Sequence, residues 1–464
     1  MNATGKDLKV STRLADFALA LQLDWVPETV RERARHLLLD GIGLALATTA
    51  LGYADVTLAA LHELGQGGAT VFGKRDTLAW RDAMVMNGLL VHGLDFDDTH
   101  SRGVIHATAS ALPCAFGLAE REGASGAQLL TAYIAAMEVS TRLGAVAQGG
   151  FHKAGFHPTG LVGAFGCSLA AAKLMGLDVA QAVHAQGIVL SMAAGSLEFL
   201  EDGAWTKRLH PGWAAASAAT AATLARHGYI GPGAAYEGRH GLYSLYLGAA
   251  RPQDLSEASA SLGEHWEIDA VALKPIPACH FTHAASDAAA ALYRAHGLAG
   301  EAIERVVVRL PAAVVPVVCE PLSNKRKPAN HYDAQFSIPY IVAIGLLKGR
   351  FTLDDLEPQA LADPQVLALA QRIDYEVDPD STFPRHYSGE VVVHTRDGRR
   401  LAQREAVNRG SADRPVSNEG IVEKFYQNAQ RVVTRERAQQ ICEAVLGLEH
   451  IEAATLAAIL RPAH

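Results

Sequence analysis

The stretch PTGLVGAFGCSLAAAKLM, residues 158–175, consists almost entirely of small and apolar side chains. Alanine is the best helix former, and small side chains let neighbouring helices approach closely. Proline is tolerated in the first turn of a helix, so we expect a helix that begins at Pro158. The apolar part is too short to span a bilayer and contains Lys173. The stretch therefore predicts a helix and not a membrane span, and its small side chains suit an internal core and subunit packing equally.

Comparable helical patterns fill the first half of the chain and predict one large helical domain. They cover residues 11–50, 79–95, 107–121, 125–148, 178–194 and 211–228. No internal repeat or low-complexity linker separates these segments. We therefore expect residues 1–265 to form one compact, all-helical domain.

The pattern changes near residue 266, where segments rich in β-branched residues begin. IERVVVRL at 303–310 and residues 373–378 are expected to be strands, and residues 390–406 a hairpin that turns at Asp397-Gly398. Helical patterns separate these strands. They lie at residues 283–297, 333–348 and 364–372. Together they predict a smaller α+β domain over residues 266–408.

The tail returns to helical patterns, and we expect residues 409–464 to complete the helical domain. The predicted fold class is therefore mainly α, with a large all-helical domain and a smaller α+β domain. A chain of 464 residues that is 49% hydrophobic can bury cores of this size.

Composition excludes several classes of function. The net charge is −8 and basic residues form no block, which argues against nucleic acid as a partner. The polar N-terminus has no signal-peptide pattern, and no apolar run reaches about 18 residues, so we expect a cytoplasmic protein without a membrane partner. The five cysteines are far apart, without a CxxC pair, and predict neither a zinc site nor disulfides. We expect them to be reduced core residues.

One acidic stretch, GLDFDDTH at residues 93–100, is unusual in a chain that is only 19% charged. If it ends a helix, Asp95, Asp98 and Thr99 share one face and Asp97 points elsewhere. His106 follows shortly after and adds a second imidazole.

Four interpretations of this stretch stay open. It is an ordinary acidic helix end, or a metal site with oxygen and nitrogen ligands. It is the DxDD pattern of carbocation-forming terpene cyclases, although a chain with 6% aromatic residues offers few walls for a cation. In the fourth interpretation, its carboxylates orient a catalytic histidine.

Three further stretches carry basic residues. GFHPTGLVGAFG at 155–166 places His157 at a helix N-terminus, where the helix dipole favours anions. WTKRLHPGWAA at 205–215 holds a basic cluster just before an alanine-rich helix. KPIPACHFTHAASDA at 274–288 begins with a lysine close to the expected domain boundary. Taken singly, none of these stretches favours a functional site over its plain alternative: a capping or packed histidine for the first, a solvated turn for the second and a helix start for the third.

Taken in order, these blocks resemble the MmgE/PrpD family. The series is DFDDTH with a following histidine, GFHPTG, TK-L-H-GWAA, KP-PACHFTHAASDA and DAQFSIPYIVAIGLLKG, and it covers nearly the whole chain. The family includes 2-methylcitrate dehydratases, cis-aconitate decarboxylases and an iminodisuccinate epimerase. The resemblance implies a large helical domain with a smaller α+β lid domain, usually in a homodimer.

The resemblance also implies a set of site residues. The catalytic residues by this comparison are Asp95, His106, His157 and Lys207. The substrate-binding residues are Thr99, Lys274 and His280. Two positions depart from the family pattern: His100 stands where tryptophan is common, and His280 stands where arginine is common. Without the bidentate guanidinium, position 280 gives less support to tricarboxylate binding.

The activity that the resemblance implies is proton transfer next to a carboxylate of a small di- or tricarboxylic acid. No cofactor and no metal is implied, so lysines and histidines have to hold the carboxylates and stabilise the developing charge. The leading expectation is a lyase, either a dehydratase or a decarboxylase. The alternatives are an epimerase of an iminodisuccinate-like dicarboxylate and a non-catalytic homologue that binds a carboxylate. On this interpretation the aspartates set the geometry of imidazole and hydroxyl groups.

Overall fold

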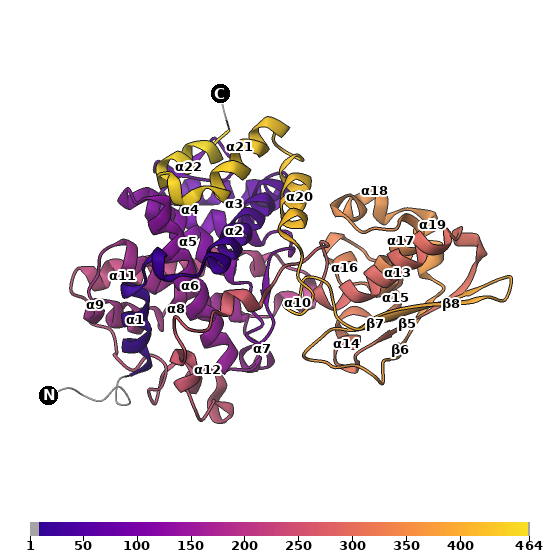
Figure 1. Ribbon diagram of the computed structural model, residues 1–464, viewed down its shortest axis with the longest axis horizontal. Coiled ribbons are helices and arrows are strands. Elements are labelled where there is room, and N and C mark those ends of the chain that lie inside the picture. Colours follow the sequence, from indigo (N-terminus) through magenta and orange to yellow (C-terminus); the bar gives the residue numbers. More distant parts are fainter. Residues whose placement is uncertain (1–8, 463–464) are drawn as a thin grey trace. The chain divides into compact units, whose positions relative to one another are not determined.

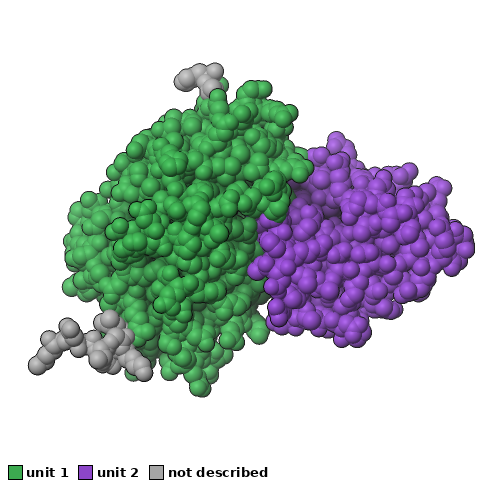
Figure 2. Space-filling model, in the orientation of Figure 1, with its two compact units in different colours: residues 1–272, 417–464 green, residues 273–416 purple. Residues whose placement is uncertain are grey.

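The computed structural model describes residues 9–462, which form two compact units (Figure 2). The larger unit lies within residues 1–272 and 417–464, and the smaller one comprises residues 273–416. The boundaries expected at 265/266 and 408/409 lie seven and eight residues before these. The fold is mainly α, as the sequence predicted.

The larger unit is built almost wholly from helices (Figure 1). They are α1 (Val10–Ala20), α2 (Glu28–Thr48), α3 (Gly52–Leu64), α4 (Trp80–His92), α5 (Ala107–Glu122), α6 (Gly126–Val146), α7 (Gly150–Lys153), α8 (Pro158–Leu174), α9 (Val179–Val189), α10 (Phe199–Asp202), α11 (Thr206–Arg226), α12 (Leu242–Leu247), α20 (Asn418–Ala429), α21 (Arg435–Leu446) and α22 (Ala453–Leu460). Its strands are two-residue pairs: β1 (Ala69–Thr70) with β2 (Thr77–Leu78), and β3 (Thr99–His100) with β4 (Val271–Ala272).

Helix α8 is the centre of this unit, and it contacts α5, α6, α9 and α11. Every residue from Pro158 to Ala172 is buried, because the helix has no polar face to present to solvent. Glycine makes the contact with α6 possible: a Cβ at Gly166 would lie 2.1 Å from the Ser140 hydroxyl and 2.4 Å from the Ala136 carbonyl oxygen. The predicted helix is therefore confirmed, and of the two placements left open by the sequence it takes the internal one.

Helices α4 and α11 cross at a pair of glycines. A Cβ at Gly88 would lie 2.4 Å from the Gly212 Cα, and one at Gly212 would lie 2.2 Å from the Val85 carbonyl oxygen. Any side chain at either position would push the helices apart. This crossing sets the distance between the C-terminal end of α4 and the N-terminal half of α11.

The C-terminal tail belongs to the larger unit, where α20 packs against α2. Within residues 9–462 no single helix is both long and apolar enough to cross a membrane. Helices α2 and α3 pass that test by length and composition only when taken together, and they are bent by 90° at their break. The five cysteines are free and buried, in agreement with the expectation of core residues.

The smaller unit is a four-stranded sheet with helices (Figure 1). Its strands are β5 (Ile303–Leu310), β6 (Ile373–Val377), β7 (Gly389–Thr395) and β8 (Arg400–Glu405), in the spatial order β6-β5-β7-β8. Its helices are α13 (His283–His296), α14 (Val315–Val318), α15 (Leu322–Arg326), α16 (His331–Gln335), α17 (Ile338–Lys348), α18 (Pro358–Leu361) and α19 (Pro364–Ala370).

Within this sheet β5 pairs parallel with β6 and antiparallel with β7, and β7 forms the expected hairpin with β8. Helix α13 packs against β7 and β8, and α17 packs against α13. The predicted strands and hairpin of this α+β unit are therefore confirmed.

We expect Gly212→Ala to lower the free energy of unfolding by about 1–3 kcal/mol, because the new methyl group would clash with the backbone of α4, which cannot move aside as a side chain can. Urea unfolding followed by circular dichroism measures the change. Gly52→Ala is the matched control, since a Cβ there meets nothing within 4 Å, and it should leave stability unchanged or slightly raised. Equal stability of Gly212→Ala and the wild type would contradict the close crossing.

Candidate functional site

The acidic stretch forms a buried loop between α4 and α5 and is not a helix end. Helix α4 ends at His92, and Asp95 has a φ of +50°, in the left-handed region that non-glycine residues rarely adopt. The prediction that Asp95, Asp98 and Thr99 share a helical face is therefore wrong. A side chain held in a strained backbone conformation is typical of functional sites.

Asp97, which was expected to point away from the site, lies in the middle of it. One carboxylate oxygen lies 2.7 Å from His92 Nδ1, and the other lies 3.5 Å from His106 Nδ1. A carboxylate can only accept, so His92 donates its Nδ1–H to Asp97, which leaves Nε2 without a proton in the neutral ring. The sequence prediction misplaced Asp97 because it assumed helical geometry.

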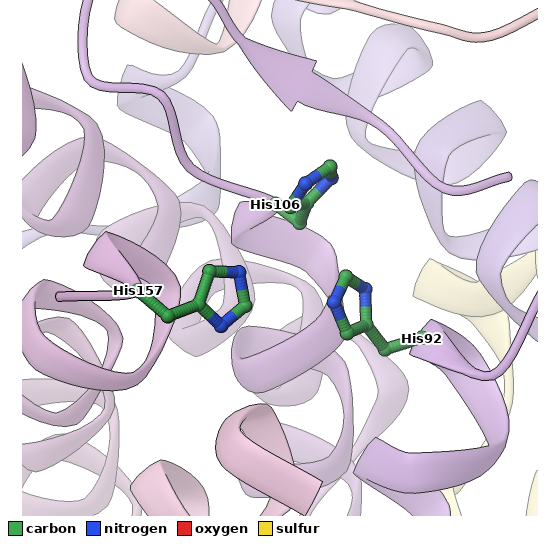
Figure 3. A group of neighbouring side chains, drawn as sticks. All are labelled: His92, His106 and His157. Carbon is green, nitrogen blue, oxygen red and sulfur yellow. The ribbon is translucent and has the colours of Figure 1, made fainter. Parts of the chain in front are cut away.

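Three histidine rings meet where three helices end or begin (Figure 3). His92 ends α4, and His106 and His157 are the residues immediately before α5 and α8. The ring centroid of His92 lies 4.8 Å from that of His106 and 5.5 Å from that of His157. The expected position of His157 at a helix N-terminus is confirmed. His92 was not singled out from the sequence, although a histidine just before an aspartate run is a visible signal.

His106 is held by the loop that precedes it. Its Nδ1 donates to the Asp98 carbonyl oxygen at 2.8 Å, and its backbone N–H donates to the Thr159 hydroxyl at 3.0 Å. The Thr99 hydroxyl lies 3.4 Å from the same Nδ1. The His106 side chain is 13% exposed, whereas that of His92 is fully buried. His106 is therefore the more accessible of these two imidazoles.

Lys207 lies on the first turn of α11, and its ammonium is 2.8 Å from the Asp95 carboxylate. The basic stretch at 205–215 was expected to lie just before an alanine-rich helix. It instead forms the first part of that helix, because α11 begins at Thr206 and includes Pro211. His210, from the same helix, lies 3.1 Å from His157 through their Nδ1 atoms. Four of the expected residues of this unit, Asp95, His106, His157 and Lys207, thus lie around one loop.

Burial and nearby cations keep the imidazoles of His157 and His210 neutral. Burial is the main cause that lowers the pKa of His157 well below its usual value, and the charges of neighbouring histidines and Lys207 add to it. Burial, together with His92 and Lys207, lowers the pKa of His210 to about 4. A neutral imidazole can accept a proton or bind a metal ion, so both rings are in the reactive form at neutral pH.

Asp98 is a buried carboxyl group with an unusual proton affinity. Burial and the charge of Asp97 raise its pKa to about 8, although the Thr108 N–H donates to it. Nearby, Lys424 of α20 donates to the Phe96 carbonyl oxygen at 2.9 Å and pairs with Asp40 at 2.8 Å. This contact fastens the acidic loop to the C-terminal tail. The sequence motifs gave no sign that the tail contributes to the site.

His100 lies in the loop between Thr99 and His106, and its side chain is fully buried. Its Nε2 donates to Glu267 at 2.9 Å, and its Nδ1 accepts from the Gly103 N–H at 3.3 Å. Arg102 also binds the Glu267 carboxylate. Histidine at this position therefore links the loop that carries His106 to the chain segment before β4.

Lys274 and His280 belong to the smaller unit, and both are buried. Asn408 donates to His280 Nε2 at 2.9 Å, and the ring of His283 lies 4.7 Å from that of His280. Burial and the charge of Lys274 lower the pKa of His280 to about 3. A neutral imidazole therefore stands where the family pattern has a guanidinium, so this position supplies no positive charge.

Two groups of side chains in the described part of the chain have the residue types and spacing to hold a metal ion. They are His92, His106 and His157, and Asp95, Asp97 and His106; within each group the candidate ligand atoms lie within 4.8 Å of one another. The first group offers the imidazoles that transition metals prefer, and the second offers a mixed site.

Comparison with known proteins gives matches along nearly the whole chain. The model of the MmgE/PrpD N-terminal domain matches residues 12–254, and that of the MmgE/PrpD C-terminal domain matches residues 276–449. The cis-aconitate decarboxylase of Mus musculus is 30% identical over 96% of this chain and 91% of its own length. The cis-aconitate decarboxylase of Homo sapiens is 29% identical over 93% of this chain and 90% of its own length. The 2-methylcitrate dehydratase of Cupriavidus necator is 32% identical over 38% of each chain.

We expect Glu267→Gln to destabilise the protein by roughly 1–3 kcal/mol at neutral pH, since a charged partner of His100 and Arg102 is lost. Burial alone would raise the pKa of Glu267, but hydrogen bonds from these two residues lower it to about 2. A lowered carboxyl pKa stabilises the fold above the ordinary value of 4.5, and this stabilisation disappears as the pH falls toward 2.

The difference in unfolding free energy between wild type and Glu267→Gln should therefore shrink as the pH falls from about 7 to about 3. Urea unfolding across that range measures it, with the exposed Glu264→Gln as matched control. A difference that stays constant with pH would contradict the proposed ion pairing.

Proposed function

Because the chain belongs to the MmgE/PrpD family, we propose that it is a lyase acting on a small tricarboxylic acid, and that decarboxylation of a cis-aconitate-like substrate is its reaction. The relatives named cis-aconitate decarboxylase match over more than nine tenths of this chain. Those named 2-methylcitrate dehydratase match over 38% of it. The structural observation that carries the proposal is that the ammonium of Lys207 and several neutral imidazoles lie around one buried loop.

The chemistry requires a stabilised carbanion. Loss of CO₂ from the CH₂-carboxylate arm of cis-aconitate breaks a carbon–carbon bond, and its electron pair moves across the double bond to the carbon beside another carboxylate. A proton then adds to that carbon and gives an unsaturated dicarboxylate. An enzyme for this reaction has to neutralise the developing charge and deliver one proton.

Lys207 suits the first task. Its ammonium has three donors, so it can keep the contact with Asp95 and still bind a substrate carboxylate. The pairing also holds the long side chain in place before substrate arrives, which reduces the entropy lost on binding. Because Asp95 offsets the charge of Lys207, the ammonium acts on an anionic substrate through directed, charge-assisted hydrogen bonds and not through a net positive charge of the site.

His106 suits the second task. Its Nδ1–H is committed to the Asp98 carbonyl oxygen, so proton transfer falls to Nε2. Asp97 lies close enough to stabilise the imidazolium form. His157, kept neutral, binds a carboxylate or the enediolate by hydrogen bonding, and Thr99 orients the ring of His106.

Dehydration of a hydroxy acid is the second candidate, supported by the partial match to the 2-methylcitrate dehydratases. It begins with proton removal beside a carboxylate and ends with departure of a β-hydroxyl group. Epimerisation, in which the proton returns to the opposite face, and carboxylate binding without turnover are the remaining alternatives. Three expectations stay predictions: independence of any cofactor, substrate binding by Thr99, Lys274 and His280, and the lid role of the smaller unit.

We expect Lys207→Met and His106→Gln each to lower kcat on cis-aconitate by at least about 100-fold, since charge stabilisation and proton transfer each contribute that much. Product formation measured by chromatography, with 2-methylcitrate as second substrate, tests both variants. Lys153→Met, at an exposed lysine, is the control. Folded variants with unchanged kcat would contradict the site. A wild-type protein that turns over neither acid would contradict the lyase.

We also propose that the chain forms a homodimer through an exposed apolar stripe that begins at Trp205, just before α11, and continues along that helix. Trp205, Leu209 and Trp213 follow one another at four-residue spacing, so they share a helix face, and they are 54%, 37% and 52% exposed. Large exposed side chains in a row are typical of interaction surfaces.

Light scattering after size exclusion should therefore give twice the chain mass of 49.2 kDa for the wild type and the monomer mass for Trp213→Glu. The introduced carboxylate would have to be buried in the interface, and the free-energy cost of burying it separates the subunits. A monomeric wild type, or a Trp213→Glu variant that stays dimeric, would refute this arrangement.

A further inference from the structure

We propose that His92, His106 and His157 form a binding site for a divalent transition-metal ion such as Zn²⁺, and that the bound ion inhibits the protein. Their candidate ligand atoms lie within 4.8 Å of one another. The three rings face a common centre (Figure 3). Three imidazoles with a fourth position open to a small ligand is a frequent zinc arrangement.

Each of the three rings is already fixed through its other nitrogen. His92 Nδ1 donates to the Asp97 carboxylate, and His106 Nδ1 donates to the Asp98 carbonyl oxygen. His157 Nδ1 is hydrogen-bonded to His210 Nδ1. Histidines that bind metal ions almost always hold their second nitrogen in this way. The oxygen acceptors of His92 and His106 leave Nε2 as the ligand, and His157 offers Nε2 in the tautomer that donates its Nδ1–H to His210.

Two of these Nε2 atoms are buried and lack a hydrogen-bond partner among the described residues. They belong to His92 and His157, which are 1% and 3% exposed. An unsatisfied buried polar atom is costly, and each such atom calls for an explanation. A metal ion at the centre of the three rings would bind both.

Charge decides which ions the site accepts. The carboxylates of Asp95 and Asp97 offset a divalent charge, while the ammonium of Lys207 opposes it and is itself paired with Asp95. Imidazole prefers zinc, copper and nickel over magnesium and calcium. Zn–N bonds of about 2.0–2.1 Å require the three nitrogens to move closer to one another by roughly 1 Å. We therefore expect selective binding of transition metals.

The expected consequence is inhibition and not activation. The ion would occupy Nε2 of His106, the atom to which we assign proton transfer, and it would hold His157 away from substrate. Binding itself does not depend on the proposed function, because it follows from the three imidazoles and their partners alone.

The test uses the full-length protein after exhaustive chelation, without substrate. Titration with Zn²⁺ in a calorimeter should show one tight equivalent, and titration with Co²⁺ should give the visible absorption of a low-coordinate nitrogen site. His92→Gln should weaken Zn²⁺ binding by at least about 100-fold, and the exposed His227→Gln should leave it unchanged.

Because His92 is buried, Asp97→Asn provides a second variant that keeps all three ligands. It should weaken binding about 10–100-fold, as loss of a carboxylate behind a metal-bound histidine does. The absence of a tight equivalent in the wild type, or equal affinity in the wild type and both folded variants, would overturn the proposal. Turnover by the chelated protein is measured separately. Zn²⁺ binding without turnover refutes only the lyase, and turnover without Zn²⁺ binding refutes only the metal site.

Discussion

The arrangement of the larger unit depends on the burial of aspartates in the loop between α4 and α5. A buried carboxylate is tolerated only when it is paired, hydrogen-bonded or protonated. Asp95 is paired with Lys207, and Asp97 accepts from His92. Asp98 instead has its pKa raised to about 8, so it holds a proton through much of the neutral range. These requirements bring an ammonium and several imidazoles to one loop.

Close helix packing makes these pairings possible. The glycine crossing of α4 and α11 brings the helix that ends in His92 against the helix that carries Lys207. The fully buried α8 places His157 at its N-terminus, in the same region. Small residues therefore do more than fill the core, since they determine which helix ends meet. A larger side chain at the crossing would disturb the site as well as the stability.

Much of the fold could be predicted from composition and periodicity, because the buried α8 and the β7–β8 hairpin have strong local signals. The loop of the site could not, since the left-handed conformation of Asp95 and the partners of Asp97 arise from tertiary contacts. His92 and Lys424 were missed for the same reason: their roles come from neighbours in space. Family resemblance pointed to Lys207 and His106 by position, and the geometry around them supplies a physical reason.

The proposed lyase relies on side chains alone to stabilise a carbanion next to a carboxylate. Proton NMR of the exhaustively chelated protein with cis-aconitate in D₂O tests it most directly. The account predicts loss of CO₂ and one deuterium on the carbon beside the retained carboxylate, in the absence of any metal ion. A reaction that starts only after a divalent ion is added back, or a product without solvent deuterium at that carbon, would contradict it.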